Sequence, residues 1–166
     1  MTARRCSVVI FCALSAVACG RDGTSGAGAA PAYLPESVRE ARALEAEQAA
    51  KIAAATTGRA WSVVDISGQA MIEGSDAGLA FGNDMTVSGS AGCNGFNGEY
   101  TLESAQLSFG PLATTRKLCA DPIMQQERRV LDTLGQVISA GVDEDGLLFL
   151  STLNGDVIKL VPRETD

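Results

Sequence analysis

The sequence predicts an α+β fold, in which an antiparallel β roll or cracked barrel packs on one helix and is preceded by a flexible tether and a spacer helix. From Gly58 to Val161, short pieces rich in β-forming residues alternate with turn residues, and one helical segment interrupts them. Asn154-Gly155 is the strongest short hairpin signal among these turns. A single helix amid antiparallel strands buries its apolar face against the curved sheet, and this gives the predicted architecture.

The chain begins with the pattern of a secretory signal peptide over residues 1–18. Arg4 and Arg5 precede an apolar stretch from Cys6 to Ala18, which ends in small residues. This stretch is too short to span a membrane comfortably. We therefore predict that the chain is exported.

The end of this leader, Ala16-Val17-Ala18-Cys19-Gly20, resembles a bacterial lipobox. In that case Cys19 carries a lipid, anchors the chain to a membrane and becomes the mature N-terminus. An ordinary signal peptidase cutting after Ala18 is the alternative, and it leaves a soluble periplasmic or secreted protein. Because no aspartate follows Cys19, we expect an outer-membrane lipoprotein facing the periplasm of a bacterial cell envelope.

Residues 19–58 are predicted to be a lipid-anchored tether followed by an alanine-rich helix. Residues 20–34 are rich in Gly, Ala, Ser and Thr, a composition that buries too little apolar surface to order itself. Pro35 suits the first helical position, and the helix runs to about Ala55. Since its apolar face is mostly alanine, we expect a spacer outside the core, with a coiled-coil strand as the alternative.

The folded domain is predicted to span residues 59–163. Turn signals separate its strands, among them Asp76-Ala77-Gly78 and the acidic run that ends at Gly146. The segment from Gly89 to Tyr100 places four glycines three apart, and we interpret it as a folded loop joining two strands. The predicted strands are Trp61–Ile66, Leu79–Phe81, Met85–Ser88, Glu99–Glu103, Gln106–Phe109, Val137–Val142, Leu147–Ser151 and Val157–Val161.

One helix is predicted between these strands. Asp121 is the expected N-cap, Pro122 lies in the first turn, and Gly135 ends the helix. An apolar stripe is expected to face the sheet, and a charged face is expected to point outward. The stripe consists of Ile123, Val130, Leu131 and Leu134, and the outer face of Glu127, Arg128 and Asp132.

Composition argues against several classes of function. The chain has no histidine, which removes the Ser-His and Cys-His nucleophile systems and the commonest zinc ligand. Its net charge of −7 and its few adjacent basic pairs argue against nucleic-acid binding. The acidic run at Asp143 lacks the spaced ligands of a calcium loop. We therefore expect no metal, no cofactor and no enzymatic activity.

Several segments together resemble the META or HslJ-like domain over roughly residues 59–162. They are the strand opened by Trp61, the strand Leu79–Phe81, VSGSAGCNGFNGEY, LSFGPLATTRKLC and the helix that contains Glu127. The resemblance implies a cracked-barrel fold similar to that of pilotins, the lipoproteins that escort secretin subunits. It also implies a bacterial envelope protein, often a lipoprotein, associated with heat-shock expression or antibiotic tolerance.

Two cysteines belong to the folded domain, because Cys6 and Cys12 leave with the leader and Cys19 is the expected anchor. Export to an oxidising compartment favours a disulfide between Cys93 and Cys119. Buried free thiols and a redox pair are the alternatives, the last disfavoured by the absence of a C-x-x-C motif.

The polar residues closest to these cysteines are candidates for a binding site, and they are Asn94, Asn97, Thr114, Thr115 and Arg116. The alternative is that Asn94 and Asn97 only satisfy the backbone of a turn.

The predicted function is binding rather than catalysis. The expected ligand is a hydrophobic peptide, an acyl chain or an outer-membrane protein, bound in a groove between the helix and the sheet. The resemblance to pilotins and the expected anchor carry this prediction, so its basis is fold analogy. The alternatives are a structural periplasmic module without a ligand and a thiol redox protein.

Overall fold

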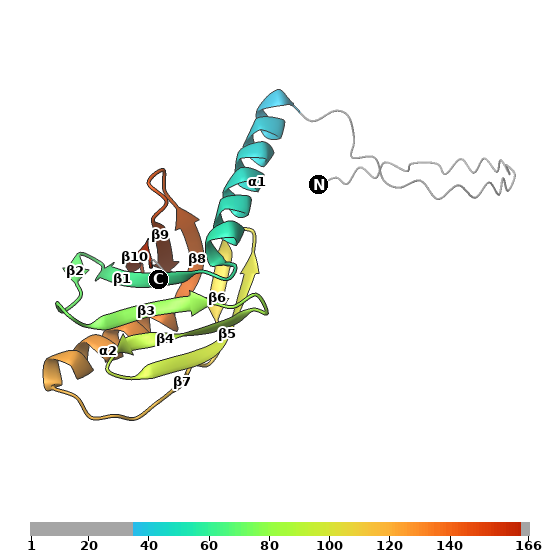
Figure 1. Ribbon diagram of the computed structural model, residues 1–166. Coiled ribbons are helices and arrows are strands. Elements are labelled where there is room, and N and C mark those ends of the chain that lie inside the picture. Colours follow the sequence, from blue (N-terminus) through green and yellow to red (C-terminus); the bar gives the residue numbers. More distant parts are fainter. Residues whose placement is uncertain (1–34, 164–166) are drawn as a thin grey trace, which may run out of the picture. The chain divides into compact units, whose positions relative to one another are not determined.

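The computed structural model describes residues 35–163, in which an antiparallel sheet curls until it nearly closes a barrel and two helices accompany it (Figure 1). The predicted fold class is therefore confirmed. The elements in chain order are α1 (Glu36–Thr56), β1 (Ala60–Ile66), β2 (Gln69–Ala70), β3 (Asp76–Phe81), β4 (Thr86–Gly92), β5 (Gly95–Glu103), β6 (Gln106–Phe109), β7 (Ala113–Thr114), α2 (Asp121–Leu134), β8 (Val137–Val142), β9 (Leu148–Thr152) and β10 (Val157–Pro162).

The strands follow the order β6-β5-β4-β3-β1-β10-β9-β8, while β2 pairs with β1 and β7 pairs with β5. The two end strands, β6 and β8, approach each other across the crack of the barrel. Near one end of this crack, the amide of Ala140 donates a hydrogen bond of 2.9 Å to the carbonyl of Ala105. The barrel is thus tied at this point.

The core lies inside the curled sheet. Strand side chains alternate between its two faces, and the inward ones are apolar. The Phe81 and Tyr100 rings meet edge to face with their centroids 4.9 Å apart. Leu107, Leu148, Leu150, Ile158 and Leu160 are 0% exposed, so several strands contribute to one continuous core.

The last turn of α1 belongs to this core, whereas the sequence predicted a spacer outside it. Ile52 is 1% exposed and Thr56 is 0% exposed. The indole Nε1 of Trp61 donates a hydrogen bond of 2.8 Å to the carbonyl of Ala55, and the Tyr100 hydroxyl donates one of 3.3 Å to the carbonyl of Thr56. The earlier turns stand away from the sheet (Figure 1) and are mostly exposed. Pro35 is the N-cap, one residue before the predicted position.

The second helix, α2, packs against β4 and lies behind the sheet in Figure 1. Val130 and Leu134 are each 1% exposed, as the predicted stripe requires. Two predictions for this helix are wrong. The N-cap residue is Ala120, not Asp121, and no side chain caps the first turn. Glu127, which was assigned to the outer face, is only 7% exposed.

The glycine-rich segment from Gly89 to Tyr100 is not a loop, because β4 continues to Gly92 and β5 begins at Gly95. These glycines allow the backbone to approach closely. A Cβ on Gly89 would lie 2.2 Å from the carbonyl oxygen of Gly78 and 2.8 Å from the Phe96 ring. The same crowding explains why the predicted turn at Asp76–Gly78 is strand, since a Cβ on Gly78 would lie 2.4 Å from the Trp61 carbonyl.

The predicted signal peptide, the expected anchor Cys19 and the predicted tether lie outside the described residues. Within residues 35–163, neither helix contains a stretch long and apolar enough to cross a membrane.

Candidate functional site

Asn94 occupies the tight turn between β4 and β5, where it contacts Glu127 of α2. The amide N–H of Asn94 donates a hydrogen bond of 2.6 Å to Oε2 of Glu127, and its side-chain Nδ2 donates one of 2.9 Å to Oε1. Asn94 is 2% exposed, so both groups meet away from water. Hydrogen bonds that involve a carboxylate are the stronger ones in proteins, and these two fix α2 to the turn.

The Asn94 amide also holds the segment that precedes α2. Its Oδ1 accepts hydrogen bonds from the Thr115 hydroxyl at 2.9 Å and from the Lys117 amide at 2.6 Å. Its Nδ2 donates a further bond of 3.2 Å to the Lys117 carbonyl. A primary amide has two donors and two acceptor positions, and here all four are occupied. Asn94 therefore has no free hydrogen-bonding capacity for a ligand.

A disulfide joins Cys93 to Cys119, with 6.1 Å between the two Cα atoms. Cys93 precedes Asn94 in the turn, and Cys119 lies two residues before α2 begins. The bridge therefore connects the same two segments that Asn94 connects by hydrogen bonds. We call Cys93, Asn94, Thr115, Cys119 and Glu127 the turn–helix junction.

The five polar candidates from the sequence do not form one site. Asn94 and Thr115 come together in the turn–helix junction, where the Thr115 hydroxyl also accepts a hydrogen bond of 3.1 Å from the Gly95 amide. Asn97 and Thr114 are exposed on the neighbouring strands β5 and β7, and Arg116 is exposed in the following segment. Asn94 and Thr115 therefore support the fold through internal hydrogen bonds, whereas Asn97, Thr114 and Arg116 lie on the open surface.

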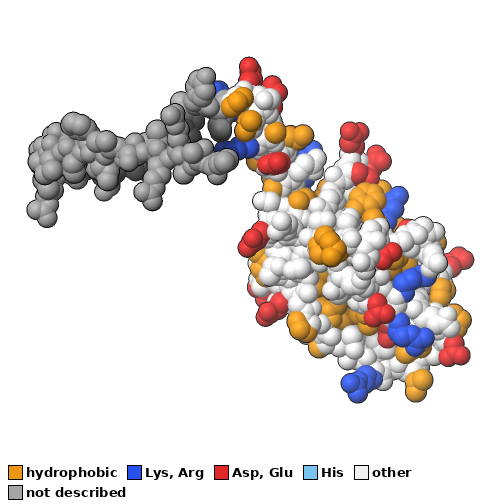
Figure 2. Space-filling view, turned by 180° about the vertical axis from the view of Figure 1, so that it is seen from behind, with side chains coloured by type: hydrophobic (Ala, Val, Ile, Leu, Met, Phe, Trp, Pro, Cys, Tyr) orange, Lys and Arg blue, Asp and Glu red, His pale blue; other side chains and the backbone are white. Residues whose placement is uncertain are grey.

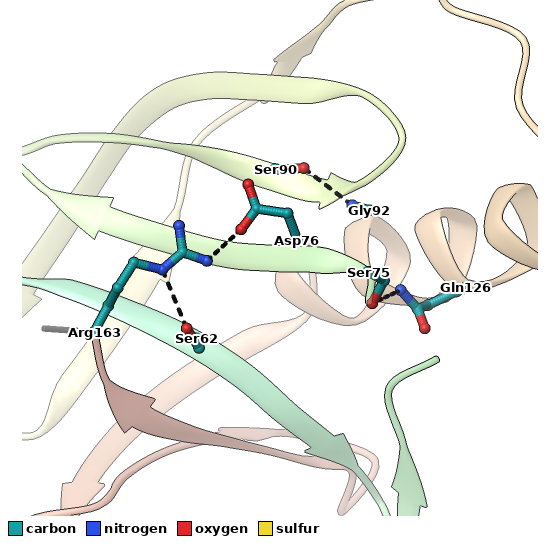
Figure 3. A network of polar contacts seen from close by, with 7 residues as sticks. All are labelled: Ser62, Ser75, Asp76, Ser90, Gly92, Gln126 and Arg163. Carbon is teal, nitrogen blue, oxygen red and sulfur yellow. Dashed lines mark hydrogen bonds and ion pairs between the residues drawn. The ribbon is translucent and has the colours of Figure 1, made fainter. Parts of the chain in front are cut away.

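Sequence reasoning missed two buried polar residues of α2, Gln126 and Glu127. Gln126 is 3% exposed, accepts a hydrogen bond of 2.6 Å from the Ile72 amide and donates one of 2.9 Å to the Ser75 hydroxyl. Figure 3 shows the contact with Ser75 at the ends of β3 and β4. Glu127 comes four residues after Ile123 and three before Val130. This helical spacing places Glu127 on the apolar stripe, and the spacing was the feature of the sequence that could have predicted its burial.

Figure 3 also shows a second polar group, formed by Arg163 after β10. Its guanidinium contacts a carboxylate oxygen of Asp76 at 2.7 Å and donates a hydrogen bond of 3.1 Å to the Ser62 hydroxyl. All three side chains are accessible to solvent, so this ion pair adds little to stability. It ties the last residues of the domain to β1 and β3.

Four open clefts surround β6 and the hairpin that it forms with β5. The first, of about 810 Å³, lies between α1 and the β5–β6 turn, and the second, of about 600 Å³, lies between β6 and β8. A third, of about 460 Å³, separates α2 from the chain after β6, and a fourth, of about 500 Å³, lies beside the β3–β4 turn. We call these the β6 clefts.

The third cleft lies between helix and sheet, in the region where the sequence predicted a binding groove. Its apolar wall consists of Phe109, Pro111, Leu112 and Leu131, and Asp132 lies at its edge. Phe109, Leu112 and Leu131 are half-buried and also pack on the core. This part of the molecule therefore offers apolar surface to solvent, in contrast to the turn–helix junction.

Two groups near the fourth cleft, Tyr100 and Asp84, have shifted pKa values. Burial raises the pKa of Tyr100, and the nearby negative charge of Asp84 adds to this effect. A hydrogen bond from the Thr86 hydroxyl lowers the pKa of the exposed Asp84. Residues 35–163 contain no group of three or more Cys, Asp or Glu side chains placed to hold a metal ion.

Comparisons with known proteins identify both the family and the fold of this chain. The chain is 36% identical over 67 residues to the heat shock protein HslJ of Escherichia coli (strain K12), a match covering 40% of this chain and 45% of that protein. The chain therefore aligns with less than half the length of this curated relative.

Two solved structures resemble the fold. A protein from Burkholderia xenovorans, determined by NMR, has a TM-score of 0.60 and 26% identity, covering 69% of this chain and 89% of that one. A DUF4847 family protein from Bacteroides vulgatus has a TM-score of 0.51 at 14% identity, covering 69% and 99%, and shows the fold alone. The family model described as the META domain matches residues 54–165. The chain belongs to the META domain family.

Proposed function

We propose that this protein is a lipid-anchored component of the bacterial envelope, and that its META domain acts by binding a hydrophobic peptide or an envelope protein. The observation that carries the proposal is the cleft between α2 and the chain after β6. Half-buried apolar side chains line this cleft, and a partner that covers them gains the free energy of removing apolar surface from water.

The polar residues support binding rather than catalysis. Asn94 belongs to the glycine-rich motif, and internal hydrogen bonds occupy its whole side-chain amide. A catalytic group must instead offer a free donor, acceptor or nucleophile to its substrate. A thiol redox role is a weaker alternative, because the cysteines are 26 residues apart and not in a C-x-x-C motif.

The location rests on two independent features. The leader ends at Cys19 in a lipobox-like sequence, and the domain carries a disulfide of the kind that persists in oxidising compartments. An anchor on Cys19 would hold the domain at a membrane, and we place it at the outer membrane facing the periplasm. The relative named as a heat shock protein adds a role in the stress response to the proposal, and the family resemblance adds one in antibiotic tolerance.

The test is crosslinking of the tagged protein in its own envelope, followed by purification and mass spectrometry. Leu131→Lys alters the cleft beside α2, and Leu118→Lys is the matched control because Leu118 is 97% exposed and lies outside that cleft. Cys19→Ser removes the anchor. We expect one partner in near-stoichiometric yield, lost in Leu131→Lys and Cys19→Ser and retained in Leu118→Lys.

Two further measurements make the outcome decisive. Thermal unfolding identifies a Leu131→Lys protein that fails to fold, and Asp132→Lys then replaces it, because Asp132 is exposed at the same cleft. Intact mass of the membrane-bound protein tests for the lipid on Cys19. Recovery of background proteins alone with every folded variant would contradict a binding role and leave a structural module without a ligand.

A further inference from the structure

We propose that the β6 clefts bind an extended polypeptide segment in which apolar and basic side chains alternate. The inference rests on the proposed binding function and names the class of partner. It arises from three properties of the described residues: the arrangement of the clefts along one strand, the exposed hydrophobic side chains in them, and the charge of their rims.

The clefts follow one another along β6. Glu103 and Gln106 line both the first and the second cleft. The fourth cleft shares Thr101 with the second and Gly110 with the third, so the four clefts are contiguous. A strand rises about 3.3 Å per residue, so the path from Gln106 to Gly110 is on the order of 13 Å long. A linear path of this length suits several residues of extended chain rather than a compact ligand.

Three of the seven exposed large hydrophobic side chains among the described residues lie in these clefts. Leu44 is 61% exposed in the first cleft, Ile138 is 46% exposed in the second, and Met85 is 49% exposed in the fourth. Large side chains with this much exposure gain from a partner that covers them. Since alternate residues of an extended segment point to one side, apolar residues at every second position would reach successive clefts. The basic residues between them point away from the clefts, and their long, flexible stems would bend back to bring the charged ends to the acidic rims.

The rims of the clefts are acidic. Their only basic lining residue is Arg42, whereas five acidic residues line them: Glu45, Asp84, Glu99, Glu103 and Asp132. Figure 2, which views the molecule from behind, shows hydrophobic, acidic and basic side chains interspersed on that face. Electrostatic complementarity therefore favours a basic partner.

The same charges disfavour the other occupants. A second copy of this chain brings a net negative surface, since the whole chain has a formal charge of −7. An anionic lipid headgroup would meet carboxylates instead of the Lys and Arg that bind it. A basic, apolar polypeptide satisfies both the hydrophobic floor and the acidic rim of these clefts.

The test measures binding of two fluorescent peptides to the purified full-length protein in a neutral detergent. The probe is an acetylated octapeptide of alternating Val and Lys, and its control alternates Val and Glu. Glu103→Lys is the informative variant, because Glu103 lines three of the clefts. Glu73→Lys makes the same charge change at an exposed position outside them. Ile138→Lys and Leu153→Lys form a second pair, since Leu153 is 82% exposed and lies elsewhere.

We expect the Val-Lys peptide to bind, the Val-Glu peptide not to bind, and affinity to fall with added salt. Glu103→Lys should weaken binding roughly fivefold relative to Glu73→Lys, as loss of a few exposed charge contacts predicts. Ile138→Lys should weaken it more than Leu153→Lys does. Equal binding of the two peptides, no binding of either, or equal effects within both variant pairs would overturn the inference.

This outcome is separate from that of the proposed function. If the envelope crosslinking recovers a partner that Glu103→Lys still binds normally, the domain is a binding module but its partner is not held by these charges. If the crosslinking recovers no partner, the proposed function itself fails.

Discussion

The turn–helix junction and the β6 clefts lie on the same small barrel, but they differ in which side chains they bury and which they expose. In the junction, the buried side chains of Asn94 and Glu127 are hydrogen-bonded to each other, and a disulfide braces the same two segments. In the clefts, hydrophobic side chains such as Leu44 and Ile138 remain exposed. The most recognisable motif of this chain therefore supports its fold, while the less distinctive surface around β6 leaves apolar side chains exposed to solvent.

Removal of the disulfide is expected to have the largest effect on the stability of the junction. Cys119→Ser should lower the free energy of unfolding by about 3.5 kcal/mol, the chain-entropy value for a loop of this length. Urea denaturation of the variant measures the loss. The unsubstituted protein under reducing conditions should show the same decrease. A loss below about 1 kcal/mol would mean that the hydrogen bonds of the junction suffice to hold α2.

Next in size is the effect of the motif asparagine. Asn94→Ala should cost about 2–3 kcal/mol, because the buried Glu127 carboxylate keeps only the backbone amide of residue 94 as a donor, and the Lys117 amide and the Thr115 hydroxyl lose their acceptor. Asn97→Ala is the matched control and should change stability by less than about 0.5 kcal/mol, since Asn97 is exposed. Chemical denaturation of both variants gives the comparison. Similar losses from the two substitutions would refute the distinction between them.

Tyr100 belongs to both a cleft and the core, since it lines one of the β6 clefts and its hydroxyl bonds to the last turn of α1. Tyr100→Phe should cost about 0.5–1 kcal/mol near neutral pH through the lost hydrogen bond. Burial raises the pKa of Tyr100, so the folded state holds the phenol proton more tightly than the unfolded state does.

This contribution is therefore complete below the unfolded pKa of about 10, and it is lost as the pH rises through the folded pKa. Urea unfolding of both proteins from neutral to strongly alkaline pH should show the deficit of Tyr100→Phe shrinking above the unfolded pKa. A difference that is independent of pH would show that Tyr100 ionises equally easily in both states.

The smallest effect is expected in the clefts. Ile138→Lys should change the free energy of unfolding by less than about 0.5 kcal/mol, because Ile138 is 46% exposed and its replacement stays in water. Thermal or urea unfolding measures this, with Leu153→Lys as the control. A loss as large as that of Asn94→Ala would show that the cleft side is packed as tightly as the junction.

Local patterns allowed much of the fold to be predicted from sequence. Alternating apolar residues marked strands such as β1 and β10, and the helical stripe through Val130 and Leu134 marked α2. The family resemblance agreed with both. These features follow from a period of two or 3.6 residues, which a sequence displays directly.

The predictions from sequence were wrong where a residue makes or permits a contact with a segment far away in the sequence. Gly78 and Gly89 were interpreted as turn or loop residues, but each permits another part of the backbone to approach within strands. Glu127 was interpreted as solvent-exposed because it is charged, although its helical position placed it on the buried stripe. The clefts depend on how closely β6 and β8 approach across the barrel, which no local pattern specifies.

The burial of the last turn of α1 has a mechanical consequence. A helix of 21 residues is about 31 Å long and stiff, and only its final turn is embedded in the barrel. Tension applied at Glu36 would be transmitted along α1 to Ile52 and Thr56, and from there to Trp61 in β1 through the bond to the Ala55 carbonyl. For an anchored protein, β1 in the middle of the sheet would then bear the load, rather than an edge strand that could peel away.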